Sequence, residues 1–277
     1  MKTMNCLLAG LPDTGKSTYI GGLWYNLKNL SEKMVMKASR DLVDDTQRLE
    51  ILSDKWVDGI KVDRTTEDQS SSVELRIEQK DNGNVLTINI PDFSGETFRQ
   101  IIEMTDSKDL DSWCEEADTL FYMANKLAPG HFEDDADISG IAEDGEEKND
   151  EVSSFNPQKM SGSAQNIMVL KYLFERKCFK KVIFAISCWD KVTENGKHPE
   201  NPDVWLKNQS PALYNFLKNY HPNSTIVGVS AQGFDYEEVE NNDIIADKTM
   251  YGERAFVEIG DDIIYDLSLP LYMLINE

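Results

Sequence analysis

The segment from Gly10 to Ser17 constrains this chain more than any other part of the sequence. It reads Gly-Leu-Pro-Asp-Thr-Gly-Lys-Ser, which has the form GxxxxGK[ST], and it directly follows an apolar run that ends at Ala9. Such a loop lets backbone amides curl around a phosphate, while its lysine neutralises the phosphate charge and its hydroxyl holds Mg²⁺ at the start of a helix. The segment therefore predicts a strand, a nucleotide-binding loop and a helix in that order.

We expect the loop to hold the phosphates of the nucleotide. The residues assigned to phosphate binding are Gly10, Asp13, Thr14, Gly15, Lys16, Ser17 and Thr18. Lys16 is further assigned to the β and γ oxygens as a catalytic residue, and Ser17 to the metal ion. A glycine turn that binds nothing is the alternative, and the apolar run before the loop and the helical pattern after it argue against that alternative.

Composition limits the classes of protein that this chain can be. Its 277 residues, 40% of them hydrophobic, suit an α/β protein, which we take to be one enlarged domain over 1–277. The net charge of -22 repels nucleic acids and anionic lipids, so neither is an expected partner. Four cysteines at unrelated spacings indicate reduced thiols in the cytoplasm, and no apolar run is long enough to span a membrane.

Apolar periodicity predicts the order of the elements. A helical pattern over 17–30 supplies the helix that the loop needs, and a second one between 42 and 60 lies in an insertion, 38–66, that covers the core and includes the first switch region. Alternation on both sides of the turn at 81–84 predicts a β-hairpin. Further strands are expected at 119–123, 181–186 and 225–229, with helices at 98–113, 165–177 and 203–220, the last broken at Ser210-Pro211. The whole predicts a mixed, mostly parallel sheet with one antiparallel hairpin strand, helices on both faces and acidic loop insertions.

Two acidic stretches interrupt this pattern. The segment 128–162 includes ten acidic residues against Lys148 between His131 and Glu151, so it cannot bury enough surface to order itself, and we predict a mobile insertion. It is either a solvated loop or a docking segment for a basic partner surface. The stretch 234–249 is similarly acidic and is predicted to be a loop.

A second group of candidate residues follows the strand at 86–90. Asp92 stands where a strand ends and would hold Mg²⁺ through a water molecule. Gly95 has no side chain, so its backbone amide could approach a γ-phosphate closely. A simple turn is the alternative, because turns are rich in both residue types.

A third group suggests which base is bound. Asp190 follows the strand at 181–186, and a carboxylate there can accept two hydrogen bonds from guanine that adenine cannot offer. After the last strand, Ser230 and Ala231 form a small-residue turn whose Ala231 amide could donate to the guanine oxygen. We assign Asp190, Cys188, Ser230 and Ala231 to guanine binding, with a helix cap and a polar turn as the alternatives.

These segments together resemble the GTPases of the translation-factor and Ras-like class. Gly10–Ser17 matches the phosphate loop, and Asp92-x-x-Gly95 matches the switch motif. Ser187–Asp190 is a degenerate form of Asn-Lys-x-Asp, and Ser230–Gln232 of Ser-Ala-Lys. The hairpin agrees, because kinases with this loop normally use parallel crossovers. The resemblance implies a Ras-like G domain with GTP or GDP as its ligand and Mg²⁺ as its cofactor.

A finer resemblance comes from the residues around the loop. The sequence Gly21-Gly22-Leu23-Trp24 after the loop and the large acidic insertions look like the bacterial double-GTPase family, and within it the second type. Membership would imply a second GTPase or an effector protein as partner, in a bacterial conflict or antiviral defence system.

Departures from the class pattern bear on activity. Glu96 stands where Ras-like enzymes place a glutamine that orients the attacking water, so intrinsic hydrolysis is expected to be slow. Cys188 cannot supply the lysine stem that normally covers the ribose. Thr66, with Thr65 as the other candidate, is expected to close over Mg²⁺, and the alternative is that both are surface threonines in a disordered loop. The catalytic assignments are thus Lys16, Glu96 and Thr66, and the metal assignments are Ser17, Thr66 and Asp92.

The leading hypothesis is a guanine-nucleotide switch that hydrolyses GTP slowly to GDP and phosphate. A pseudo-GTPase that binds nucleotide for structure is the second, prompted by Glu96 and Cys188. A phosphotransferase that moves a phosphoryl group to a small acceptor is the third, and the scattered arginines and the hairpin argue against it.

Overall fold

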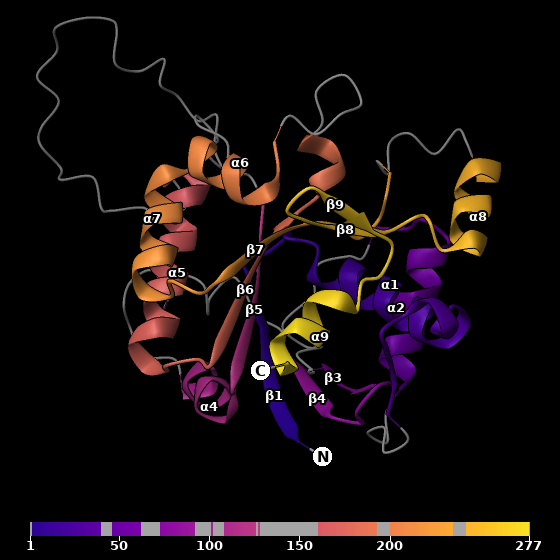
Figure 1. Cartoon of the computed structure of the whole chain (residues 1–277), viewed down its shortest axis with the longest axis horizontal. Helices are drawn as coiled ribbons and strands as arrows, with labels where there is room; N and C mark the ends of the chain where they lie inside the picture. The colour runs from indigo at the N-terminus through magenta and orange to yellow at the C-terminus, as the bar shows by residue number, and fades with distance from the viewer. Residues whose placement is uncertain are drawn as a thin grey trace, which may run out of the picture.

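The computed structural model describes residues 2–39, 46–61, 73–91, 101, 108–125, 127, 160–192, 200–234 and 242–276, without the side chains at 108–109 and 242–244. Within these ranges nine strands form a single sheet in the order β2-β3-β4-β1-β5-β6-β7-β8-β9 (Figure 1). The predicted α/β class and mixed sheet are confirmed.

The middle of the sheet is parallel and its two margins are antiparallel. The parallel strands are β4 (Val85–Ile90), β1 (Thr3–Ala9), β5 (Thr119–Ala124), β6 (Lys181–Ser187) and β7 (Thr225–Ser230). The antiparallel strands are β2 (Met36–Ala38) and β3 (Val73–Gln79) on one side, and β8 (Phe256–Ile259) and β9 (Asp262–Ile264) on the other. The β3–β4 pair is the predicted hairpin, with Gly83 at a φ of 73° in its turn. Strands β2, β8 and β9 were not predicted, because three or four residues are too few to show alternation.

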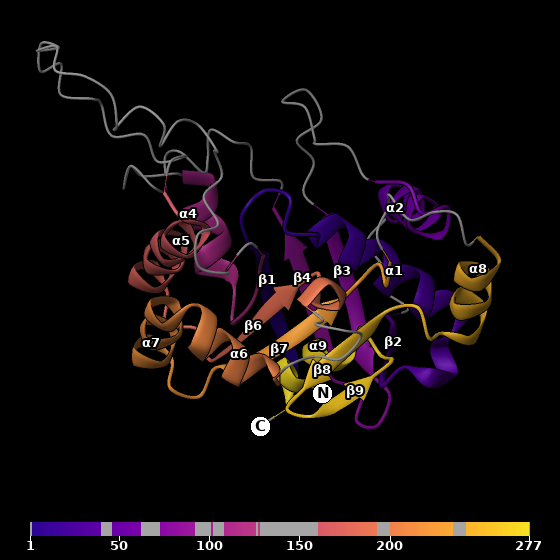
Figure 2. The ribbon, with the colours of Figure 1, turned by 90° about the horizontal axis from the view of Figure 1, so that it is seen from above.

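Helices cover both faces of the sheet (Figure 2). One face carries α1 (Lys16–Asn29), α2 (Gln47–Val57) and α9 (Leu269–Ile275), and α8 (Asn242–Tyr251) lies beside α1. The other face carries α4 (Lys108–Glu116), α5 (Gly162–Arg176), α6 (Pro202–Gln209) and α7 (Pro211–Tyr220). Short 3₁₀ turns, η1 (Ser31–Lys33) and η5 (Trp189–Val192), follow α1 and β6. The predicted break at Ser210 separates α6 from α7.

The side chains of β1 alternate between two apolar cores. Cys6 and Leu8 point into the core beneath α1, α2 and α9, whereas Leu7 and Ala9 point into the core beneath α4 to α7. Because both faces of the central strands are covered, β5 and β6 are largely apolar and show little alternation in sequence.

The expectation of a loop over 234–249 is wrong where α8 begins, at Asn242. Most of the described side chains of α8 are exposed, so the helix carries no apolar stripe that would reveal it in the sequence. The helix ends at Tyr251, whose carbonyl accepts a hydrogen bond from Lys33, and Gly252 directly after it has a φ of 68°. Most of the acidic segment predicted at 128–162 lies outside the described residues. Its last part, 160–162, is described, and Gly162 begins α5.

All four cysteines are free thiols, and burial raises the pKa of Cys6 and of Cys114 to about 12. In the part of the chain that the structure describes, no helix is both long enough and apolar enough to cross a membrane.

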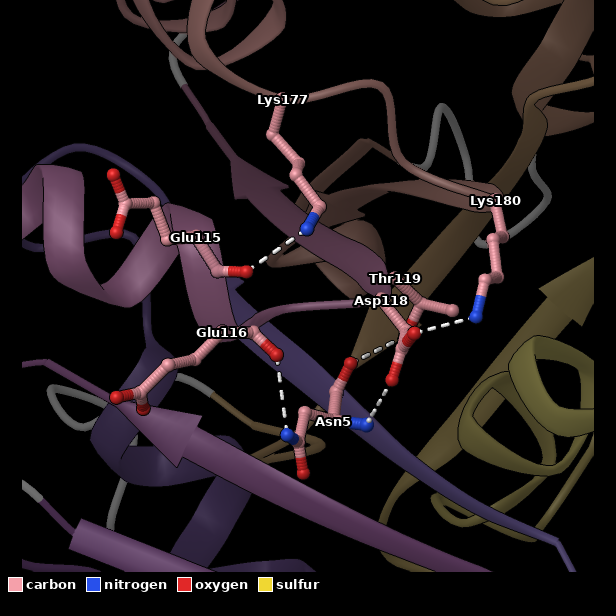
Figure 3. A network of polar contacts seen from close by, with 7 residues as sticks. All are labelled: Asn5, Glu115, Glu116, Asp118, Thr119, Lys177 and Lys180. Atoms are coloured by element: carbon pink, nitrogen blue, oxygen red, sulfur yellow. Dashed lines mark hydrogen bonds and ion pairs between the residues drawn. The ribbon is translucent and has the colours of Figure 1, made fainter.

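Asp118 ties together the amino ends of the central strands (Figure 3). Its carboxylate accepts a hydrogen bond from the Asn5 backbone amide at 3.0 Å and one from Lys180 Nζ at 2.6 Å. Burial alone would raise the pKa of Asp118, but the bonds from Lys180 and Asn5 outweigh burial and hold the pKa below its ordinary value. The network lies at the end of the sheet opposite to the candidate site, so it stabilises the fold.

The depressed pKa of Asp118 makes its contribution to stability depend on pH. The contribution is fully present above the pKa of an unfolded aspartate and is lost as the pH falls through the folded-state pKa. Asp118→Asn should lower the free energy of unfolding by about 1 kcal/mol at pH 7 and by progressively less in acid, as the pH falls through the folded-state pKa of Asp118. Urea unfolding at pH 7 and at a series of acidic pH values measures this difference. Glu175→Gln, which breaks an exposed ion pair with Lys171, serves as the control, and a loss for Asp118→Asn that does not depend on pH would contradict the argument.

Candidate nucleotide site

The predicted site residues that the structure describes lie along one edge of the sheet, where the parallel strands end. β1 leads into Gly10, β6 into Cys188 and β7 ends at Ser230, and β5 lies between β1 and β6. Ligands of open parallel sheets bind in the crevice outside these carboxyl ends. Two segments carry the residues assigned to guanine, Cys188–Asp190 and Ser230–Ala231, and we call them the first and second guanine segments. The structure thus brings the loop and both guanine segments to the same edge, although they are far apart in sequence.

The backbone of the loop is shaped by residues with positive φ. Asp13 has a φ of 60° and Gly15 a φ of 80°, both in the left-handed region. Gly10 has a φ of 153°, and a Cβ at this position would overlap the carbonyl oxygen of Met123 in β5. The glycine at position 10 is therefore required by the close passage of the loop over the neighbouring strand.

Lys16 folds back over the loop. Its Nζ donates to the carbonyls of Gly10 at 2.8 Å and Leu11 at 2.7 Å. The buried Thr14 hydroxyl donates to the same Leu11 carbonyl at 2.8 Å. These bonds hold the ammonium group within the loop, where its charge favours a phosphate.

The helix that follows the loop begins in a way that favours an anion. Its N-cap is Gly15, which makes no side-chain cap, and the first turn contains no acidic residue. The first amides of a helix have no partners within the helix and carry the positive end of its dipole. Ser17 is exposed in this turn and Thr18 is half-buried beside it. The start of α1 is therefore suited to a phosphate.

Asn125 belongs to the loop region but was missed in the sequence. It comes directly after β5, and its Nδ2 donates to the carbonyl of Asp13 at 3.0 Å. The bond fixes the left-handed turn at Asp13 from the neighbouring strand. Its position, a polar residue at the carboxyl end of a central strand, was the available signal.

The two guanine segments meet directly. Asp190 accepts a hydrogen bond from the buried Ser230 hydroxyl, with an Oγ to Oδ1 distance of 2.8 Å. Cys188 is exposed and has a φ of 54°, so the chain turns sharply between β6 and Asp190. The small side chain of Ala231 follows Ser230 at the same edge. The bond from Ser230 orients the carboxylate that we assign to the base.

Trp189 anchors the turn that carries Asp190. Its ring is buried against Gly228 of β7, where a Cβ would overlap the indole. Its Nε1 donates to the buried carboxylate of Glu258 in β8 at 2.7 Å. Neither contact was predicted. The one with Glu258 depends on β8, a strand that the sequence pattern does not reveal, and the one with Gly228 depends on how the turn after β6 packs on β7.

Helix α2 contacts the backbone of the second guanine segment. Trp56 donates from its Nε1 to the carbonyl of Ala231 at 2.8 Å. The buried Arg254 lies over the Trp56 ring, 3.9 Å from its centroid, and donates to the Gln232 carbonyl at 3.0 Å. The helix expected only to cover the core therefore contacts the site.

The donors expected for Mg²⁺ are partly described. The hard cation prefers oxygen ligands, and the described part of the site offers one of them, the exposed Ser17 hydroxyl. Pro91, which follows β4, lines the same small cavity as Ser17. The expected residues Thr66, Asp92, Gly95 and Glu96, like Thr65, lie outside the described residues.

A mixed, mostly parallel sheet with a glycine loop between β1 and α1, and an oriented carboxylate after β6, defines a G domain of the P-loop GTPase class. A family model described as Double-GTPase 1 matches residues 7–274, and the chain belongs to this family. The double-GTPase resemblance is thereby confirmed and the expectation of the second type is wrong. None of the curated proteins compared with the chain matches it.

Solved structures of similar fold include three GTPase-related proteins. A bacterial selenocysteine-specific elongation factor EF-Sec has 16% identity and a TM-score of 0.39, over 90% of this chain and 29% of its own. Era from Aquifex aeolicus, bound to GDP and AlF₄⁻, has 16% identity and a TM-score of 0.40, over 88% and 56%. The GTPase-like domain of S. cerevisiae Ski7, bound to GTP, has 18% identity and a TM-score of 0.44, over 83% and 43%. The chain thus spans between 29% and 56% of the length of these proteins.

The close approach of α1 and α2 depends on two glycines. A Cβ on Gly21 would overlap the backbone carbonyl oxygen of Leu52, and a Cβ on Gly22 would lie 2.7 Å from Trp56 Nε1. Alanine normally stabilises a helix interior by about 1 kcal/mol relative to glycine. At Gly21, however, an added Cβ would force α1 and α2 apart, because the atom that it would meet is part of the α2 backbone.

Gly21→Ala should therefore lower the free energy of unfolding by about 2 kcal/mol, against its helix propensity. Denaturant unfolding followed by circular dichroism measures the change. Asn29→Ala, at an exposed position of α1, is the control and should leave the stability nearly unchanged. A Gly21→Ala protein as stable as the wild type would show that α2 does not pack this closely.

Proposed function

We propose that this protein is a guanine-nucleotide switch, which binds GTP and GDP with Mg²⁺ and hydrolyses GTP slowly. The observation that carries the proposal is the hydrogen bond from Ser230 to Asp190 at the sheet edge that also holds the Gly10–Ser17 loop. An oriented carboxylate can accept two hydrogen bonds from guanine, and adenine lacks that pair of donors. The loop and the carboxylate supply the two ends of a nucleotide site.

The roles within the site follow from this arrangement. Lys16 and the loop amides bind the phosphates, and Ser17, Thr66 and Asp92 hold Mg²⁺, which neutralises phosphate charge. Gly95 responds to the γ-phosphate and moves the segment that follows it. Glu96 repels the γ-phosphate where a glutamine would orient water, so hydrolysis is slow.

The second candidate is a pseudo-GTPase that binds nucleotide without turnover. The exposed Cys188, in a left-handed conformation, favours it, because this position carries no lysine stem to cover the ribose. Binding would then serve to order the site, and no phosphate would be released.

We further propose that the protein works with a second GTPase or an effector protein in a bacterial conflict or antiviral defence system, within the cytoplasm. Membership of the double-GTPase family supports a partner of this kind. The net charge of -22 supports a protein partner over nucleic acid, because a nucleic-acid backbone would be repelled.

Guanine selectivity is tested by nucleotide titration of the purified protein. The wild type should bind GDP at least about 100-fold more tightly than ADP, and Asp190→Asn should remove most of this preference by weakening GDP alone. Asp203→Asn, which removes one negative charge from α6, should leave both affinities unchanged. Equal affinity for GDP and ADP in the wild type, or an unchanged preference in Asp190→Asn, would overturn the guanine assignment.

Turnover is tested by single-turnover GTP hydrolysis with Mg²⁺. The wild type should release phosphate slowly, and Glu96→Gln should release it faster, because an amide orients water without repelling the phosphate. Lys16→Ala should abolish both binding and release. Binding without phosphate release in the wild type and in Glu96→Gln, with the partner also present, would establish the pseudo-GTPase instead.

A further inference from the structure

A small cavity opens beside the phosphate loop on the side of α2. Its volume is about 40 Å³. The residues lining it include Lys16, Ser17, Arg48, Leu52, Ile90 and Pro91. It therefore lies between the start of α1, the carboxyl end of β4 and α2. Of its described lining residues two are cationic and none is acidic, although the whole chain has a net charge of -22.

Arg48 reaches this cavity from the first turn of α2. The helix begins at Gln47, and its N-cap residue Thr46 makes no side-chain cap, so the positive end of the α2 dipole accompanies the guanidinium. Glu50 in the same turn forms an ion pair with Lys28 of α1 at 2.7 Å, and Glu50 is not among the described residues that line the cavity. The starts of two helices and two cationic residues, Lys16 and Arg48, thus line one cavity with Ser17.

The position of Arg48 is fixed by the rest of α2. The backbone of α2 meets α1 at Gly21, and Trp56 is hydrogen-bonded to the Ala231 carbonyl. Arg48 precedes Trp56 by eight residues, or about 12 Å along the helix axis. One rigid helix therefore extends from the proposed base segment to the phosphate loop, and Arg48 stands at its phosphate end.

We propose that Arg48 binds the terminal phosphate of GTP and makes the site prefer GTP over GDP. The proposal rests on the proposed function, since it assumes that guanine nucleotide occupies the loop. The loop and Lys16 hold the phosphates that GDP and GTP share, whereas the space beside Ser17 and the end of β4 is where a third phosphate and its metal ion lie in such a site. A guanidinium there adds a charge-assisted hydrogen bond that only the triphosphate can accept. Arg48 is thus a specificity-determining residue supplied by the insertion.

The affinities of GDP and of a non-hydrolysable GTP analogue, both with Mg²⁺, test this role. Arg48→Ala should weaken the analogue by about 10- to 100-fold and change GDP by less than about twofold. Arg48→Lys keeps the charge without the planar guanidinium, so its affinity for the analogue should lie between those of the wild type and Arg48→Ala. Lys55→Ala removes one positive charge from the other end of α2, away from the cavity lining, and should alter neither affinity.

Each other outcome decides against the proposal. An unchanged ratio of the two affinities in Arg48→Ala, whether both fall together or neither falls, overturns the role of Arg48 and leaves the proposed function standing. A wild type that binds neither nucleotide overturns the proposed function itself. Thermal unfolding of each variant accompanies the titration, and if Arg48→Ala is unfolded, the ratio measured for a folded Arg48→Gln takes its place.

Discussion

The candidate site depends on the position of β1 at the centre of the sheet. β1 is hydrogen-bonded to β4 on one side and to β5 on the other, so the point at which it ends cannot shift without breaking two ladders. The chain must then turn away directly over β5, where the Met123 carbonyl leaves no room for a side chain on Gly10. The shape of the phosphate loop is thus imposed by the neighbouring strands, and Asn125 adds a bond from the same side.

Much of the fold could be predicted from the sequence because long elements carry a clear pattern. The β3–β4 hairpin showed alternation on both sides of a glycine turn, and α6 and α7 were separated by a serine and a proline that suit a helix start. The C-terminal additions were missed for a physical reason. β8 and β9 are four and three residues long, and α8 is largely exposed, so none of them has a hydrophobic period to detect.

The candidate site, like the fold, could be predicted from the sequence only in part. The loop and Asp190 could be located from sequence, because phosphate and base chemistry require certain residue types at fixed spacings. The residues that hold them could not, because their partners are distant in the chain. Trp56 and Ala231 are 175 positions apart, and Trp189 and Glu258 are 69 positions apart. Such pairs obey no local rule, and only the packing of α2 and β8 brings them together.

The buried contacts of Glu258 and Arg254 affect how this protein can be divided. Both residues follow the last motif in the sequence, yet one supports the indole beneath Asp190 and the other lies behind Ala231. A fragment ending at Ser230 would keep most of the recognisable signatures and lose the support of both base segments. The C-terminal boundary of the working unit is therefore set by two unremarkable strand and loop residues, and a search for motifs alone would cut the protein in the wrong place.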